Sequence, residues 1–213
     1  MKKLALLSLA LLSGSVSAKP YMGLEYGAIS VKHDYQTHFS ADKKTVVPSE
    51  SASVLGGFIG YKTESNYGLE LGYKQFDLDG SSSQLLPSDK PEFILEREWE
   101  SDLSVKQISL KPVMFYSLSD NIRLKSGLGL TYSHYEYSSS SYDEYEHRLN
   151  DDFELNIPRS GGENKKDSAF GIVASVGVDY NLYRNIHIGA AMEYYVDDIA
   201  NGGNITVNTS YFF

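Results

Sequence analysis

Few residues in this chain could carry hydrolytic chemistry. An acyl-transfer site needs a serine, a histidine and an acid in contact, because the histidine must take the proton of the attacking serine. Ser133 and His134 are the only candidate pair, and serine is so abundant here that we interpret their proximity as chance. His33 and His38 are five positions apart in an expected loop, which is not a helical spacing for metal ligands. We therefore expect no catalytic residue, no metal site and no cofactor.

Charged residues that alternate with apolar ones form a second candidate set. Seven of them are expected to lie inside one narrow tube: Glu25, Glu70, Lys74, Lys111, Lys125, Asp179 and Glu193. Unpaired charges there would be costly, so we expect carboxylate–ammonium pairs. Two carboxylates could also hydrolyse a glycosidic bond, but these lie on separate strands in a filled interior that no sugar could enter. We interpret the set as a structural plug, with a gate whose pairs exchange partners as the alternative.

The elements that would position these residues are strands, in which side chains alternate with a period of two. Eight alternating segments are predicted near 20–31, 53–61, 67–76, 104–116, 122–135, 168–180, 186–196 and 205–213. The links between them are about 21, 5, 27, 5, 32, 5 and 8 residues long, so long and short links alternate. This rhythm indicates an up-and-down barrel with short turns on one side and long loops on the other.

One face of each segment is apolar and the other is not. Ile188 and Met192 share one face of the seventh segment, whereas Gly189 and Glu193 share the other. A face of glycine, serine and charge cannot build a dry core, so we expect the apolar face to meet lipid. The predicted fold is all-β, an eight-stranded antiparallel up-and-down transmembrane β-barrel with short periplasmic turns and long extracellular loops. Pro112 cannot donate a ladder hydrogen bond, so a bulge or local distortion is expected there.

The two ends of the chain favour export to a bacterial outer membrane. Residues 1–18 combine a basic start, an apolar run and small residues before position 19, so we interpret them as a signal peptide ahead of a barrel domain at 19–213. Tyr211 and Phe213 end an alternating strand. A terminal aromatic residue of this kind resembles the signal that the barrel-assembly machinery reads in outer-membrane proteins.

The acidic composition excludes one class of partner. Without Lys2 and Lys3 the chain has 17 basic and 28 acidic residues, a net charge of −11. Nucleic-acid binding needs a basic surface, so no nucleic-acid partner is expected. The expected loops at 77–103 and 136–167 have net charges of −6 and −5. Such loops keep a surface solvated, and binding of divalent cations or of a basic partner is the alternative.

Aromatic residues in these two loops are the candidates for interaction: Phe93, Trp99, Tyr137, Tyr142 and Tyr145. The alternation around them indicates strands that continue above the membrane. An extended hairpin would present an open sheet edge to a host-surface or other protein partner. A projecting sheet that only stiffens the rim of the barrel is an equal alternative.

Several segments resemble a known class of barrels. Residues 68–73 (GLELGY), 108–112 (ISLKP), 127–132 (GLGLTY) and 211–213 (YFF) resemble strands of the OmpA and OmpX class of eight-stranded outer-membrane barrels. The resemblance covers the chain after residue 18 and implies its architecture, whereas barrels of this class include adhesins, plugs and enzymes. Residues 20–27 (PYMGLEYG) and the chain length are also similar to the accessory colonisation factor A family of vibrios, which would imply a role in host colonisation.

We therefore expect an outer-membrane barrel, embedded in lipid and lipopolysaccharide, that mediates surface interaction or host colonisation through its acidic, tyrosine-rich loops. The main alternative is a small passive pore or an envelope-stabilising structural barrel. A lipid-modifying enzyme is the least favoured alternative.

Overall fold

The computed structural model describes residues 19–148 and 154–213, and every regular element in these ranges is a β-strand. Eight long strands form the main sheet: β1 (Lys19–His33), β4 (Ser51–Lys62), β5 (Tyr67–Leu86), β6 (Phe93–Ser117), β7 (Ile122–His147), β9 (Asn164–Tyr183), β10 (Ile186–Asp197) and β11 (Ala200–Phe212). Three short strands lie between them: β2 (Thr37–Phe39), β3 (Lys44–Val46) and β8 (Glu154–Pro158). The expected signal peptide at 1–18 lies outside the described residues. Within the described ranges, no helix has the length and apolar character needed to cross a membrane.

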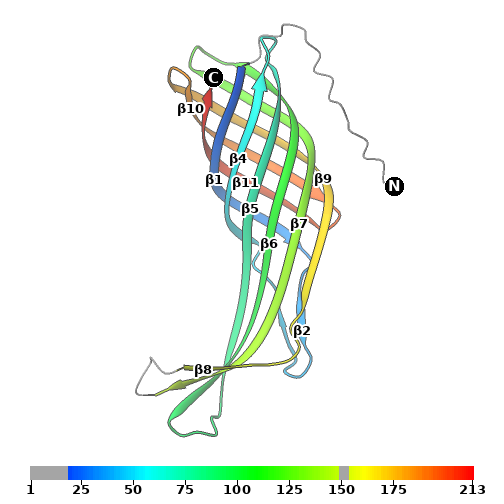
Figure 1. The fold of residues 1–213 in the computed structure, drawn as a ribbon, viewed down its shortest axis with the longest axis vertical. Coiled ribbons are helices and arrows are strands. Elements are labelled where there is room, and N and C mark those ends of the chain that lie inside the picture. The colour runs from blue at the N-terminus through cyan, green and yellow to red at the C-terminus, as the bar shows by residue number, and fades with distance from the viewer. Residues whose placement is uncertain (1–18, 149–153) are drawn as a thin grey trace, which may run out of the picture.

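The eight long strands close into a ring (Figure 1). They pair in the order β6-β5-β4-β1-β11-β10-β9-β7, and β7 pairs back with β6. The first and last strands join along most of their length, from the Tyr21–Phe212 pair to the His33–Ala200 pair. All of these pairings are antiparallel, and a closed ring leaves no free edge in its wall. The prediction of an eight-stranded antiparallel barrel is confirmed.

The outer face of the ring is apolar, as the alternation predicts. In β10 the outward Met192 is 57% exposed, whereas its neighbour Glu193 is 6% exposed. The same contrast separates the exposed Leu71 from the buried Glu70 in β5. Exposed tyrosines lie near both ends of the ring, at positions that suit the aromatic girdles of a membrane barrel: Tyr26, Tyr61, Tyr67, Tyr73, Tyr116, Tyr132, Tyr180 and Tyr194.

The two ends of the ring differ. Tight turns join β4 to β5, β6 to β7 and β9 to β10, and we call this the short-turn end. At the opposite, long-loop end, β5, β6 and β7 continue beyond the ring, and β8 pairs with the far part of β7. β6 and β7 are 25 and 26 residues long, about twice what a tilted strand needs to cross a bilayer. The four strands form a projecting sheet (Figure 1), so the expected continuation of the two acidic loops as strands is confirmed.

Of the two outcomes expected at Pro112, a bulge or a local distortion, the structure has the local distortion and no bulge. The register between β6 and β7 is the same before and after it, from the Leu110–Leu130 pair to the Val113–Gly127 pair. Between these pairs the ladder to β7 is interrupted, while the ladder to β5 continues. The proline therefore removes hydrogen bonding on one side of the strand without inserting a residue.

The interior is packed in layers along the barrel axis. An aromatic layer near the short-turn end contains Tyr21, Phe58, Phe115 and Phe212. Charged residues occupy the middle. Toward the long-loop end lies a larger apolar cluster that includes Ile29, Val31, Val54, Phe76, Leu78, Leu103, Val105, Tyr135, Tyr137, Val173 and Tyr195. The expectation that the inner face cannot build a dry core is therefore wrong for this part, because the inward positions change from small and charged to apolar along each long strand.

Candidate functional site

Glu193 is the centre of one half of the charged middle layer. Its Oε1 lies 2.6 Å from Lys74 Nζ, and its Oε2 lies 2.7 Å from Lys111 Nζ. Lys74 Nζ also lies 3.6 Å from Glu25 Oε1. These four residues come from β1, β5, β6 and β10, so the network ties strands from different parts of the ring together.

Glu70 is the centre of the other half. Its two oxygens lie 3.2 Å from Lys111 Nζ and 2.9 Å from Lys125 Nζ. The hydroxyl of Tyr21 donates a hydrogen bond to Glu70 Oε2 at 3.1 Å. With Glu25 and Glu193 the whole network has three carboxylates and three ammonium groups, so its charges cancel. Removing any one partner would leave a buried charge without its counterpart.

Asp179, the seventh residue of the expected set, belongs to a separate ion pair. Arg123 donates from Nε and Nη2 to Asp179 Oδ2, both at 3.1 Å. The guanidinium also lies over the ring of Phe212, 4.0 Å from its centroid. Sequence analysis missed Arg123, although its position between Ile122 and Leu124 of the apolar face was a sufficient signal that it points inward.

The middle layer is closely packed. A void of about 20 Å³ lies among the charged side chains, lined in part by Glu70, Lys74 and Glu193, and this is room for about one water molecule. Buried apolar side chains fill the barrel on the long-loop side of this void, and buried aromatic side chains fill it on the short-turn side. Among the described residues, this arrangement fits a plug of paired charges and gives no support to a passive pore.

Four charged residues at the long-loop end form a second arrangement, a closed ring of ion pairs. Arg97 donates from Nη1 to Asp42 Oδ1 at 2.7 Å and from Nε to Asp143 Oδ1 at 2.6 Å. Arg159 lies opposite, with Nη1 3.0 Å from Asp143 Oδ2 and Nη2 3.4 Å from Asp42 Oδ1. Hydrogen bonds from Arg97 and, to a smaller degree, from Arg159 hold the pKa of Asp143 below its usual range.

This ion-pair ring fastens the loop between β2 and β3 onto the projecting sheet. Trp99 Nε1 donates to Asp42 Oδ2 at 3.2 Å. Phe39 and Val46, which flank the loop, form a buried cluster with Trp99. The β2–β3 hairpin is thus held against the inner side of the projecting sheet, and both parts gain rigidity from the same contacts.

The outer side of the projecting sheet is acidic. Glu96 on β6 and Glu144 on β7 lie directly opposite each other in the ladder. The hydroxyl oxygen of Tyr142 lies 2.6 Å from Glu98 Oε2 and 2.9 Å from Glu100 Oε1, so two carboxylates compete for its single hydrogen. The pKa of Glu144 is raised, mainly by partial burial and to a smaller degree by contact with Glu98. Like charges in opposite ladder positions are destabilising, so this side is suited to a positively charged partner.

The five aromatic candidates have different environments. Trp99 and Tyr137 are 1% and 2% exposed, so neither can contact a partner while the sheet keeps this fold. Phe93, Tyr142 and Tyr145 are half-buried. Of the five candidates, these last three are partly exposed and stay candidates for contact with a partner.

Ser133 and His134 do not form a pair, because adjacent residues of a strand face opposite sides. Ser133 is buried in the interior. His134 lies on the outer face, with Nδ1 2.9 Å from Ser168 Oγ on β9. Glu136, two residues further along β7, forms an ion pair with Lys166, with 2.6 Å between Glu136 Oε1 and Lys166 Nζ. Within the described ranges, no group of three or more histidine, aspartate or glutamate residues could hold a metal ion.

The two residues of the expected assembly signal point outward. Tyr211 and Phe213 are exposed, and their rings are 4.9 Å apart. Phe212 between them is buried and stacks on Tyr21 at 4.7 Å. Recognition of the exposed pair by an assembly machinery stays a prediction.

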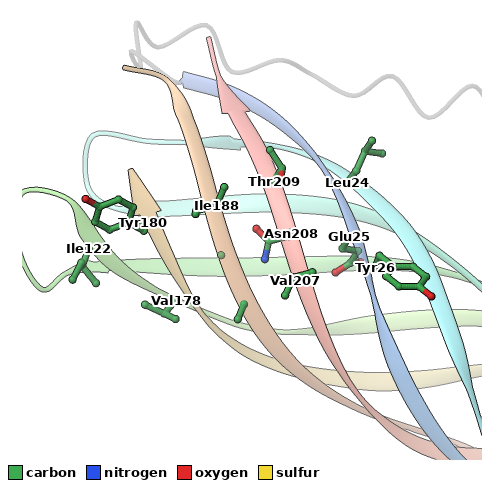
Figure 2. A pocket seen from close by; sticks show the side chains of 12 residues that line it. Leu24, Glu25, Tyr26, Ile122, Val178, Tyr180, Ile188, Val207, Asn208 and Thr209 are labelled. Carbon is green, nitrogen blue, oxygen red and sulfur yellow. The ribbon is translucent and has the colours of Figure 1, made fainter. Parts of the chain in front are cut away.

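A shallow hollow on the outer wall contains no converging set of polar groups. Figure 2 shows its lining, which is mostly apolar and includes Leu24, Val178 and Ile188 from three different strands. Glu25 also borders the hollow, but its carboxylate is engaged in the interior with Lys74. The hollow therefore suits hydrocarbon chains and has no group placed for catalysis.

Comparisons with known proteins agree with this architecture. The sequence matches the family described as the outer membrane protein beta-barrel domain over residues 4–213. The solved structures that share the fold include the following three. The attachment invasion locus protein Ail of Yersinia pestis has a TM-score of 0.52 and 14% identity, covering 92% of this chain and 99% of that one. Neisserial surface protein A has a TM-score of 0.51 and 12% identity, with coverages of 92% and 99%.

The third, the outer membrane protein OprG of Pseudomonas aeruginosa, has a TM-score of 0.53 and 14% identity, with coverages of 91% and 95%. A search of curated proteins gave no match. At these identities the likeness extends to the fold alone, and the similarity to the accessory colonisation factor A family stays a prediction.

Proposed function

Because the chain belongs to the outer membrane protein beta-barrel domain family, its apolar wall lies in the lipid of a bacterial outer membrane, and we propose that its projecting sheet is a surface for binding other proteins. The role is attachment to a host or other cell surface. It involves no catalysis and no transport through the barrel.

The observation that carries the proposal is the length and rigidity of the projecting sheet. Residues 93–103 of β6 lie beyond the predicted membrane segment. All of them pair with β7, and residues 95–103 also pair with β5. At about 3.3 Å per residue they extend over roughly 35 Å of strand. The ring of Asp42, Arg97, Asp143 and Arg159 holds this extension in one shape. A barrel that only stabilises the envelope would gain nothing from such a structure.

The charge of the sheet supports a particular class of partner. Ail of Yersinia pestis has been crystallised with the heparin analogue sucrose octasulfate, a polyanion. In the present chain the outer side of the sheet carries Glu96, Glu98, Glu100 and Glu144, and these carboxylates would repel a sulfated sugar. We therefore propose a basic protein surface as the partner.

Truncation of the β5–β6 hairpin tests the proposal. Residues 82–99 are replaced by Asn-Gly, a turn that suits a two-residue hairpin and keeps Ser81 opposite Glu100. Nanodiscs that contain the full or the truncated protein are then applied to immobilised host-cell surface proteins. We expect binding by the full protein and loss of binding by the truncated one, while both barrels remain folded.

A variant in the short-turn end, Glu64→Gln, is the matched control, because Glu64 is exposed at the opposite end of the barrel. It should bind like the unaltered protein. Equal binding by the truncated and full proteins would refute the proposed role.

A further inference from the structure

The projecting sheet has two outer edges with different properties. On one side, pairing between β4 and β5 ends at the Leu55–Gln75 pair, whereas pairing between β5 and β6 continues to the Leu86–Leu95 pair. The far part of β5 is therefore an edge strand. On the other side the edge is β8, which pairs with residues 142–146 of β7.

The backbone of β5 directs alternate hydrogen-bonding groups toward this edge. Ser49 N donates to Asp79 O at 3.0 Å, so the carbonyl of Asp79 points away from β6. Because backbone groups alternate sides along an antiparallel strand, the N–H and C=O of Ser81, Ser83 and Leu85 point the same way. Among residues 19–148 and 154–213, no strand pairs with β5 on this side beyond Gln75. Leu85 is 66% exposed.

The edge of β8 is protected against strand addition. Arg159 N donates to Ser141 O, so the odd-numbered residues of this segment direct their backbone groups toward β7. The backbone groups of Glu154, Asn156 and Pro158 therefore point away from β7, along the outer edge of the sheet. Pro158 has no N–H to offer, and a charge at Glu154 also disfavours pairing. Proline and charge are the devices by which natural edge strands avoid adding a further strand.

The edge of β5 lacks both devices. Residues 81–86 read Ser-Ser-Ser-Gln-Leu-Leu, without proline and without charge. An exposed edge of this kind is a template for a partner strand. Within one sheet, therefore, one edge is closed to pairing and the other is open.

The side chains beside the open edge indicate what it would bind. Ser81 and Ser83 lie directly opposite Glu100 and Glu98 in the ladder. The serines are small, so long side chains of an added strand can reach across them to the carboxylates. The hydroxyl of Tyr142 lies within hydrogen-bond distance of both carboxylates and can donate to either of them. A lysine or arginine at every second position of an added strand would match this spacing.

We propose that the β5 edge from Ser81 to Leu85 binds an extended segment of another protein, as an added strand with basic residues at alternate positions. The inference rests on the proposed function, because it assumes that the projecting sheet is a binding surface. It adds the location of the contact, its main-chain hydrogen bonding and the chemistry of the partner.

A second copy of the chain is a poorer occupant of this edge. Two barrels in one membrane are related by rotation about the membrane normal, which keeps the direction of each strand. Their β5 edges would run parallel, with the N–H groups of Ser81 and Ser83 facing the same groups of the other copy. No ladder forms between identical edges placed in this way.

The test uses the full protein in nanodiscs and two peptides of about nine residues, a usual strand length, one alternating Lys with Thr and the other alternating Glu with Thr. We expect the Lys peptide to bind, more weakly at high salt, and the Glu peptide not to bind. On binding, the amides of Ser81, Ser83 and Leu85 should become protected from hydrogen exchange. Protection at Asn156 instead would assign binding to β8 and overturn the inference.

Ser83→Pro removes the outward N–H of Ser83 without removing a hydrogen bond to β6. It should weaken binding of the Lys peptide about tenfold or more, through one lost hydrogen bond and a steric clash. Ser83→Ala keeps the N–H and is the matched control, with an expected change of less than about twofold. If Ser83→Pro disturbs the fold, Ser83→Lys gives a second test, because an edge lysine also opposes pairing.

The outcomes separate this inference from the proposed function. Loss of attachment in the hairpin truncation with normal attachment in Ser83→Pro would overturn the inference and leave the proposed function standing. Attachment that survives the truncation would overturn the proposed function as well. A concentration-dependent dimer that Ser83→Pro abolishes would assign the edge to a second copy, and would also overturn the inference.

Discussion

Arg97 Nη1 and Asp42 Oδ1 lie 2.7 Å apart, although the two residues are 55 positions apart in the sequence. Arg97 is on β6 of the projecting sheet, and Asp42 is in the loop between β2 and β3. Their side chains are mostly shielded from solvent, at 19% and 12% exposure. This contact therefore joins the β2–β3 loop to the projecting sheet.

Asp42→Asn should release the β2–β3 loop from the projecting sheet. The amide cannot form ion pairs with Arg97 and Arg159, which lose one of their two shared partners and keep only Asp143. We expect the free energy of local opening to fall by about 1–3 kcal/mol. Faster hydrogen exchange at residues 37–46 would measure it. Asp34→Asn changes an exposed residue of the same connection, and no change in exchange is expected; equal effects in both variants would contradict this role for Asp42.

The same ion-pair ring should open at acid pH. The pKa of Asp143 in the folded protein is lowered by Arg97 and Arg159, so the ring contributes its full stability above the unfolded pKa of about 3.9. That contribution is lost as the pH falls through the lower folded pKa. Trp99, the single tryptophan, bonds to Asp42 and should report the change by fluorescence.

We expect a constant fluorescence signal from pH 7 to about pH 4 and a transition below it. Asp143→Asn removes the titrating group and should remove the transition. A transition centred near pH 6, or one that persists in Asp143→Asn, would show that another group controls the opening.

Glu144→Gln should stabilise the projecting sheet at neutral pH. The pKa of Glu144 is raised by partial burial and then by Glu98, so its charged form is less favourable in the folded protein than in the unfolded one. The substitution removes this disadvantage at pH 7. It should have little effect at pH 3, where the Glu144 carboxyl is protonated in both the folded and the unfolded protein. Slower hydrogen exchange of residues 142–146 would measure it, with Ser140→Ala as the control. Faster exchange at pH 7 would contradict the argument.

The barrel could be predicted from the sequence because its strands alternate strictly. The period of two correctly directs Met192 outward and Glu193 inward. It also directs Lys74 and Lys111 into the interior of the barrel. The same rule would have placed Arg123 inside, where it pairs with Asp179. These features are local, since each depends only on neighbours in one strand.

The long-loop end could not be predicted in the same way. The contact of Asp42 with Arg97 and Arg159 depends on how three distant connections fold back, and no local pattern encodes it. The burial of Trp99 and Tyr137 depends on the same packing, so both looked available in the sequence. For Pro112 the sequence predicted a bulge or a local distortion but could not say which; the structure has the local distortion, with one side of the ladder unpaired and the register unchanged.

Glu193→Gln should destabilise the whole barrel. Glu193 is the only carboxylate that contacts both Lys74 and Lys111 among the described residues, and its loss would leave two buried ammonium groups poorly compensated. Breaking such a buried pair costs about 3–5 kcal/mol. Denaturant unfolding in lipid vesicles would measure the loss. Glu64→Gln, at an exposed turn, is the control, and similar stabilities for the two variants would mean that the network contributes little.

Leu71→Arg should destabilise the barrel through its outer wall. Leu71 is 45% exposed on β5 and follows Gly68, near the short turn, by three residues. This position lies within the membrane-spanning part of the strand. Arginine on the lipid face near mid-bilayer costs roughly 2–4 kcal/mol. Leu85→Arg makes the same chemical change on the same strand, beyond the membrane, where water surrounds the side chain, so it should cost much less. Denaturant unfolding in lipid vesicles would compare the two variants, and equal costs would mean that the wall around Leu71 does not lie in hydrocarbon.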